Sequence, residues 1–177
     1  VERQWEIKES YATQANLDAR NLLARANNRL AQTIAVDGSG NVFQSGYFNN
    51  ANLTTPALTT IGGTDALAIK LDSSGNTTWA KNFGGLTAGT LNVRGTARDS
   101  AGNIYLAGYT SAVLAQFGGT NLSRIGNQDV FVVKVDPTGV PIWAKNFGGS
   151  GASASSYDVA VDGSGNVYLG GYFQSAN

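Results

Sequence analysis

The chain has 177 residues, enough for one ordinary hydrophobic core, and its 12 basic side chains balance its 12 acidic ones. It contains neither cysteine nor histidine, which excludes disulfides, thiolate metal sites and histidine-based acid–base catalysis. The balanced charge also excludes the basic surface that nucleic-acid binding requires. Glycine is abundant, with 23 residues against 3 prolines, which is typical of short strands joined by tight turns.

The first ten residues resemble the last strand of a unit that occurs in full further along the chain. The word WAKNFGG is identical at 79–85 and 143–149, where it begins with Trp79 and Trp143. Trp5, in the segment Arg3–Lys8, takes the corresponding position. We therefore expect residues 1–10 to form the fourth strand of a preceding unit.

Residues 11–32 form the one stretch whose apolar side chains recur at helical spacing, so they predict an amphipathic helix inserted near the N-terminus. The stretch is not repeated, and two roles are open to it. The helix packs onto the rest of the molecule, or it docks to a partner. Its candidate partner-binding residues are Leu22, Arg25, Ala26, Arg29 and Leu30.

A unit of 62–64 residues then repeats along the chain. The word AVDGSGNV occurs at 35–42 and 160–167, with a diverged copy at 97–104. Within a unit, apolar and polar residues alternate over four segments, which predicts strands. In the first unit these segments are Thr33–Val36, Val42–Phe48, Ala66–Leu71 and Thr77–Phe83. The Asp-x-x-Gly-Asn loops between them predict tight hairpins, in which the Asp caps its own backbone and a Gly takes positive φ.

Four antiparallel strands in each repeated unit describe the blade of a β-propeller, whereas the coils of a β-solenoid are usually much shorter. The sequence therefore predicts an all-β propeller with blades at 33–85 and 86–149 and the first two strands of a further blade at 150–177. Propellers close with about four or more blades. Two alternatives follow for this partial propeller. It is a piece of a longer propeller, which the uncapped ends favour, or it closes into a ring with other copies of the chain.

Three phrases together resemble the bacterial SBBP β-propeller repeat family: AVDGSGNVYLGGYF at 160–173, the segment 128–136, and WAKNFGG. The turn phrase alone is also similar to NHL repeats, whose units are shorter. The SBBP resemblance covers roughly residues 33–177 and implies an extracellular or cell-surface bacterial protein. It brings no catalytic residues with it.

Repeated aromatic residues are the candidate contacts with a ligand. Tyr47, Tyr109 and Tyr172 each follow a glycine at the same place in their unit and precede its variable loop, so they are the candidate ligand-binding residues. The repeated Trp79 and Trp143 are better interpreted as packing between blades, because buried aromatic residues dominate such cores.

The repeated charged residues favour structural roles. Each Asp-x-x-Gly-Asn loop offers one carboxylate, whereas a calcium loop supplies six or more oxygen ligands, so Ca²⁺ is not favoured. Lys70 and Lys134 are expected to pair with Asp65 and Asp129, which lie just before the third strands.

No nucleophile with its base, unique pair of acids or metal cluster stands out, so we expect no catalysis and no cofactor. The predicted function is a scaffold for protein binding or assembly, including homo-oligomeric or filamentous assembly. A carbohydrate-binding propeller lectin is the alternative, and a propeller enzyme is a third. Neither nucleic-acid binding nor membrane insertion is expected.

Overall fold

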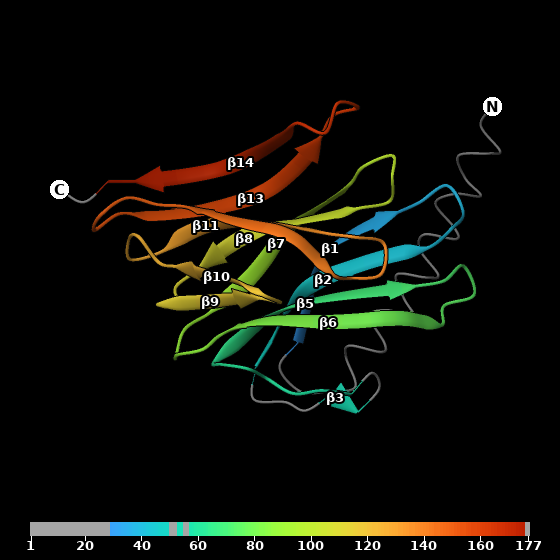
Figure 1. Cartoon of the computed structure of the whole chain (residues 1–177), viewed down its shortest axis with the longest axis horizontal. Helices are drawn as coiled ribbons and strands as arrows, with labels where there is room; N and C mark the ends of the chain where they lie inside the picture. The colour runs from blue at the N-terminus through green and yellow to red at the C-terminus, as the bar shows by residue number, and fades with distance from the viewer. Residues whose placement is uncertain (1–28, 50–52, 55–56, 176–177) are drawn as a thin grey trace.

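The computed structural model describes residues 29–49, 53–54 and 57–175, and these residues form strands and turns without any helix (Figure 1). The expected strand at 1–10 and the expected helix up to residue 28 lie outside the described residues. The strands are β1 (Arg29–Val36), β2 (Val42–Asn49), β3 (Leu53–Thr54), β4 (Ala57–Leu58), β5 (Thr64–Leu71), β6 (Thr77–Gly85), β7 (Leu91–Arg98), β8 (Ile104–Thr110), β9 (Leu114–Phe117), β10 (Thr120–Ser123), β11 (Asp129–Val135), β12 (Pro141–Phe147), β13 (Ser153–Val161) and β14 (Val167–Gln174).

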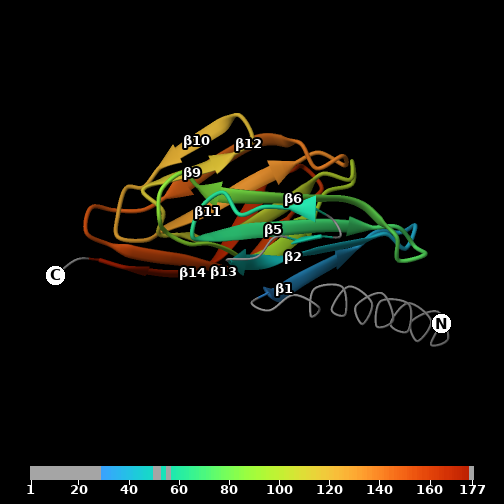
Figure 2. The same cartoon turned by 90° about the horizontal axis from the view of Figure 1, so that it is seen from below.

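The predicted four-stranded antiparallel unit is confirmed in both complete copies. The first copy orders its strands β1-β2-β5-β6, which Figure 2 shows from β1 upward, and the second orders them β7-β8-β11-β12. Strands β13 and β14 pair as the first two strands of a third copy. The three sheets are stacked face to face, and we refer to them below as blades one, two and three (Figure 1).

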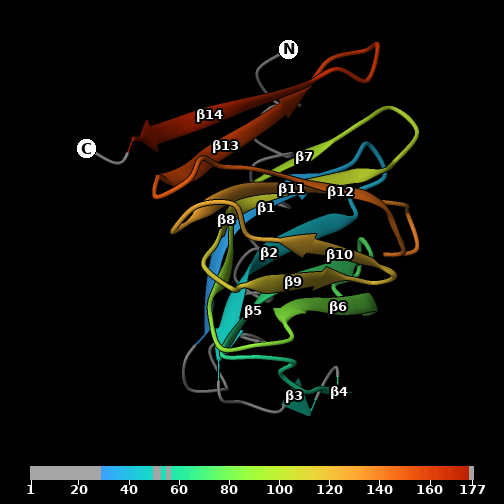
Figure 3. The same ribbon diagram turned by 60° about the vertical axis from the view of Figure 1, so that its left-hand side comes forward.

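Two short hairpins inserted between the second and third strands of a blade were not predicted. Strands β3 and β4 pair in blade one, and β9 pairs with β10 in blade two. The β9–β10 hairpin reaches back to blade one, where Gly84 and Gly85 at the end of β6 pair with Gln116 and Ala115 of β9. It therefore lies between β6 and β12 and closes the gap between blades one and two (Figure 3).

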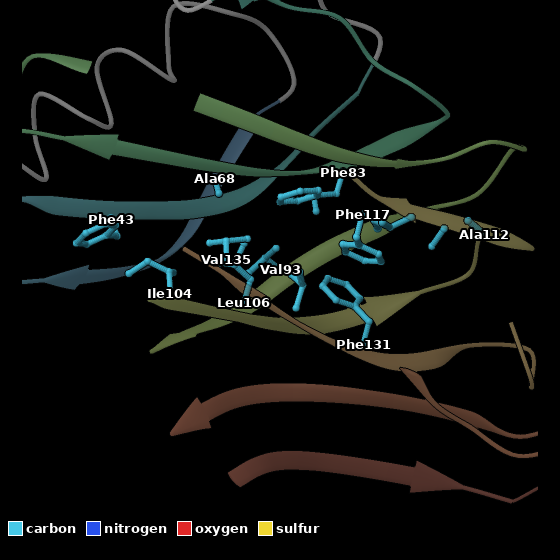
Figure 4. Close-up of a cluster of buried hydrophobic side chains, with 14 residues drawn as sticks. Phe43, Ala68, Phe83, Val93, Ile104, Leu106, Ala112, Phe117, Phe131 and Val135 are labelled. Carbon is cyan, nitrogen blue, oxygen red and sulfur yellow. The ribbon is translucent and has the colours of Figure 1, made fainter. Parts of the chain in front are cut away.

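The main core lies at the junction of blades one and two. Phe43 and Phe83 come from blade one, Phe131 comes from blade two, and Phe117 comes from the hairpin (Figure 4). The Phe117 ring lies 5.5 Å from Phe83 and 5.2 Å from Phe131, so the hairpin joins the two sheets through one row of aromatic rings.

The repeated tryptophans pack at the junctions between blades. Trp79 of blade one packs against the main core and donates its indole N–H to the Pro137 carbonyl of blade two at 2.9 Å. Trp143 packs in the smaller core between blades two and three, with its ring 6.0 Å from that of Tyr105. Both positions agree with the interpretation of these residues as packing elements.

The Asp-x-x-Gly-Asn loops form the predicted hairpins. In the first, one carboxylate oxygen of Asp37 accepts the backbone N–H groups of Ser39 and Asn41, both at 2.9 Å. The other oxygen accepts the Asn41 side-chain amide at 2.7 Å, and Gly40 has a φ of 81°. Asp72 and Asp162 repeat this arrangement, so these carboxylates are occupied by the donors of their own loops.

The predicted C-terminal end of the helix, at residues 29–32, is wrong. Strand β1 begins at Arg29, so Arg29 and Leu30 lie in a strand opposite Phe48 and Tyr47 instead of on a helix. Only the first half of β1 was missed, because the second half is the predicted strand Thr33–Val36. Gln32 is the extra residue of a β-bulge, and an extra residue breaks the period-two pattern that marks a strand. The other candidate contacts of the helix, Leu22, Arg25 and Ala26, lie outside the described residues.

Candidate functional site

Each blade carries a β-bulge at the same place in its first strand. The extra residues are Gln32 in β1, Arg94 in β7 and Tyr157 in β13, and each stands five residues before the Asp of the following hairpin. A bulge leaves one residue outside the ladder and redirects its side chain. The three repeats thus display three different side chains from one backbone position.

Arg94 connects blade two with blade three. Its guanidinium carbon lies 4.9 Å from the ring centre of Tyr109 in β8 and 5.2 Å from that of Tyr157 in β13. Both distances are within the range of a cation–π interaction. Asn92, opposite Tyr109 in the ladder, keeps a buried side-chain oxygen without a hydrogen-bond partner among the described residues.

Two tyrosines and one amide extend this site across blade three. The ring of Tyr157 lies 5.7 Å from that of Tyr172, and the two residues remain 55% and 41% exposed. The Gln128 side-chain amide donates to the Ala154 carbonyl at 3.0 Å and to the Tyr172 hydroxyl at 3.4 Å. We refer to Arg94, Tyr109, Gln128, Tyr157 and Tyr172 as the Arg94 cluster.

The structure brings together two of the three tyrosines predicted to bind a ligand. Tyr109 and Tyr172 belong to the Arg94 cluster, whereas Tyr47 lies in blade one between Leu30 and Ala66 of the neighbouring strands. Sequence reasoning missed Arg94 and Tyr157 because they do not repeat. Their shared place, five residues before the hairpin Asp, is the signal that would have marked them.

The expected pairing of Lys134 with Asp129 is wrong. Lys134 pairs with Asp99 of the hairpin between β7 and β8, with 3.1 Å between the ammonium nitrogen and the carboxylate. Lys134 lies five residues beyond Asp129 along β11, which corresponds to about 17 Å in an extended strand. Asp129 is buried and accepts the N–H groups of Ile125 at 2.7 Å and Gly126 at 2.8 Å, and the amide of Asn146 at 2.8 Å.

Asp65 holds the same place in blade one and is bonded in the same way. It is buried and accepts the N–H groups of Ile61 at 2.7 Å and Gly62 at 3.2 Å, and the side-chain amide of Asn82 at 2.7 Å. Lys70, its expected partner, instead lies 5.2 Å from the ring centre of Phe43. Fixed donors at short range compensate a buried carboxylate, and the loop supplies them without a lysine.

Asp99 is the most strongly perturbed acid in the described part of the chain, with its pKa lowered to about 2. Partial burial acts to raise this pKa, but hydrogen bonds from Asn103, Lys134 and Tyr105 to the carboxylate outweigh it. The ammonium group of Lys134 also lies 4.9 Å from the Tyr105 ring centre. These contacts tie the hairpin to strand β11, which is a structural role.

Two other kinds of site were sought in the described residues. No three acidic side chains there lie close enough together to hold a metal ion. The same residues include no helix long and apolar enough to cross a membrane.

These stacked blades define the class of β-propeller-repeat proteins, and the comparisons with known proteins agree with this class. The model of the SBBP family, described as a beta-propeller repeat, matches residues 78–114 and 142–172. These segments are SBBP repeats, which confirms the resemblance there. Each match begins in the fourth strand of one blade and extends through the first two strands of the next.

One similar curated protein is longer than this chain. It is an uncharacterized WD repeat-containing protein from Acanthamoeba polyphaga mimivirus, 32% identical over 161 residues. The similarity covers 81% of this chain but 11% of the viral protein, so the chain spans about a tenth of that relative's length.

Proposed function

We propose that the chain is a non-catalytic propeller scaffold that binds a protein partner through the Arg94 cluster. The observation that carries the proposal is the row of bulges, which displays different side chains from one repeated backbone position. At the bulges of blades two and three these side chains are Arg94 and Tyr157, and arginine and tyrosine are enriched at protein–protein interfaces. The repeat name of the viral relative supports a propeller scaffold of this kind.

The proposal places this scaffold outside the cell or on its surface. The support is the resemblance to the bacterial SBBP family, while the curated relative is viral. The absence of histidine and cysteine from the sequence supports a role in binding instead of catalysis.

Assembly with other propeller segments is the second form of this proposal. Blades one and two pack face to face over the main core, and the same packing can join blades of different chains. Among the described residues, Phe147, Leu169 and Phe173 line a groove of about 380 Å³ between blades two and three. Sedimentation of the protein over a range of concentrations tests this form, because assembly predicts species larger than one chain.

Selection from a phage-displayed library of random dodecapeptides tests protein binding directly. The intact protein is expected to enrich a family of peptides, and the double variant Tyr157→Ala/Tyr172→Ala is expected to lose it. Tyr168→Ala is the matched control, because Tyr168 is an exposed tyrosine on the same strand β14 outside the cluster. The absence of enrichment by the intact protein would overturn the proposal.

A carbohydrate-binding lectin is the alternative that the same site favours. Exposed rings of Tyr157 and Tyr172 stand beside the amide of Gln128, and aromatic faces with a few placed polar groups are typical of small-molecule sites. Binding on a glycan array that is lost in the double variant, without enrichment of any peptide, would favour the lectin.

A further inference from the structure

Resting on the proposed function, we infer that Arg94 anchors the partner by binding the carboxylate of one of its acidic side chains. The proposal names the chemistry that this surface selects. Three features of Arg94 favour this role: its unused donors, the rings that hold it, and the bulge that presents it.

The guanidinium of Arg94 has donors without partners among the described residues. None of its N–H groups forms a hydrogen bond there, and the ion pair found in that part of the chain is Lys134 with Asp99. Arg124 provides the contrast, because it donates to the carbonyls of Ser111 at 2.7 Å and Asn127 at 3.2 Å. Arg124 therefore supports a loop, whereas Arg94 supports none.

The nearest acid in the sequence of blade three does not neutralise Arg94. Asp158 follows Tyr157 directly, but one of its carboxylate oxygens accepts the Val159 N–H at 2.8 Å. It forms no ion pair with Arg94 within 4.0 Å. The positive charge of Arg94 thus remains available to an anion from outside the described residues.

The tyrosine rings hold the guanidinium in place before any ligand arrives. Tyr109 and Tyr157 come from different blades and both lie within cation–π range of it. A guanidinium is planar and donates two parallel hydrogen bonds to a carboxylate. Because the rings order the side chain, less rotamer entropy is lost when the carboxylate binds.

A second donor lies next to this anchor. The Tyr172 hydroxyl accepts a hydrogen bond from Gln128, so its own proton is free to be donated to a ligand oxygen. The Tyr172 ring also lies against that of Tyr157, which itself contacts Arg94. The cluster therefore combines one cation, the hydroxyl donor of Tyr172 and exposed aromatic area, which suits an acidic residue flanked by apolar ones.

The bulge explains how this residue can change without loss of the fold. A bulged residue is left unpaired in the ladder, so the strand pairing of β7 with β8 does not depend on the Arg94 side chain. Gln32 and Tyr157 occupy the same place in the other two blades, which shows that the backbone accepts three unlike side chains. The side chain at the bulge thus determines which ligand is bound, while the strand pairing stays the same.

The test begins with the dodecapeptides that the intact protein selects. They are expected to carry Asp or Glu at one shared position. Arg94→Gln is expected to weaken binding of a selected peptide by on the order of tenfold or more, measured by fluorescence anisotropy. Arg94→Lys is also expected to weaken it, because an ammonium group lacks the planar fork. Exchange of the peptide's acid for its amide should weaken binding to the intact protein and barely affect Arg94→Gln.

Arg98→Gln is the matched control, because Arg98 is an exposed arginine on the same strand β7 outside the cluster; it is expected to bind like the intact protein. Selected peptides without a shared acid, or equal affinity of Arg94→Gln, would overturn this inference and leave the proposed function standing. If no peptide is selected, the proposed function fails. If instead oligoglucuronate binds in an Arg94-dependent way, the carboxylate comes from a glycan and the protein-partner proposal is overturned.

Discussion

The junction of blades one and two and the junction of blades two and three contain the same repeated residues in different surroundings. Phe83 closes the first junction and is 3% exposed, whereas Phe147, its counterpart in the next unit, is 51% exposed. The β9–β10 hairpin, which follows the second strand of blade two, brings Phe117 against Phe83, whereas the described residues of blade three extend only one residue past its second strand, β14. The repeat thus sets the register of each residue, and its neighbours set its burial.

The polar residues differ between the junctions as well. The first junction contains the larger apolar core, while the second has a smaller core together with the Arg94 cluster, of which Tyr157 and Tyr172 are exposed and the other members are half-buried. Among the described residues we therefore expect the first junction to contribute most to stability, and we place the proposed recognition at the second.

The largest effect is expected for Phe83→Ala. Removal of a buried phenylalanine leaves a cavity beside Phe117 and is expected to lower the free energy of unfolding by about 3–5 kcal/mol. Phe147→Ala makes the same chemical change at an exposed site and should cost less than about 1 kcal/mol. Equilibrium unfolding in urea measures both, and equal losses would show that the two junctions do not differ as described.

Asp65→Ala and Asp129→Ala are expected to lower the free energy of unfolding by less than Phe83→Ala, and by the same amount as each other. Each substitution leaves two backbone N–H groups and one asparagine amide without their acceptor in a buried site. The expected loss is about 2–3 kcal/mol in either blade. Urea unfolding of both variants is the measurement. A loss at one site alone would mean that junction context governs these carboxylates, as it does the phenylalanines.

The next prediction concerns how the free energy of unfolding depends on pH. The folded-state pKa of Asp99 is about 2, below its unfolded value near 3.9. The carboxylate therefore stabilises the fold above about pH 4, and this contribution is lost as the pH falls toward 2. It amounts to at most about 2 kcal/mol, because the partly exposed pair is screened by solvent.

Unfolding free energies measured between pH 5 and pH 2 test this contribution. Asp99→Asn should show a weaker pH dependence than the intact protein over that range. Asp72→Asn is the control, because Asp72 lies in an exposed loop of the same kind without a lysine partner. An unchanged slope for Asp99→Asn would mean that the contacts of Lys134 and Tyr105 do not stabilise the ionised acid.

Most strands of the blades could be predicted because two signals agree. Alternating apolar residues located Ala66–Leu71 within the observed Thr64–Leu71, and the Asp-Gly-Asn loops located the hairpins between strands. The β9–β10 hairpin was missed because its strands are four residues long, although Gly118 with a φ of 60° marks its turn. Such short strands are defined by contact with β6, which the local pattern does not contain.

The candidate site could be predicted only in part for a similar reason. Tyr109 and Tyr172 repeat and were found, whereas Arg94 and Tyr157 belong to the site because bulges redirect them. The residue type at the bulge differs in each blade, so only its place, five residues before the hairpin Asp, could have marked it. The contact between Arg94 and Tyr157 also depends on two blades meeting, which appears only when the sheets are stacked.

The smallest effect on stability, and the most direct test, concerns the double variant Arg94→Gln/Tyr157→Ala. Its unfolding free energy should be compared with that of Phe83→Ala in one urea series, alongside peptide binding. The double variant is expected to stay within about 1 kcal/mol of the intact protein while it loses binding. A loss of stability as large as that of Phe83→Ala, or unchanged peptide binding, would contradict the division between a junction that holds the fold and one that recognises a partner.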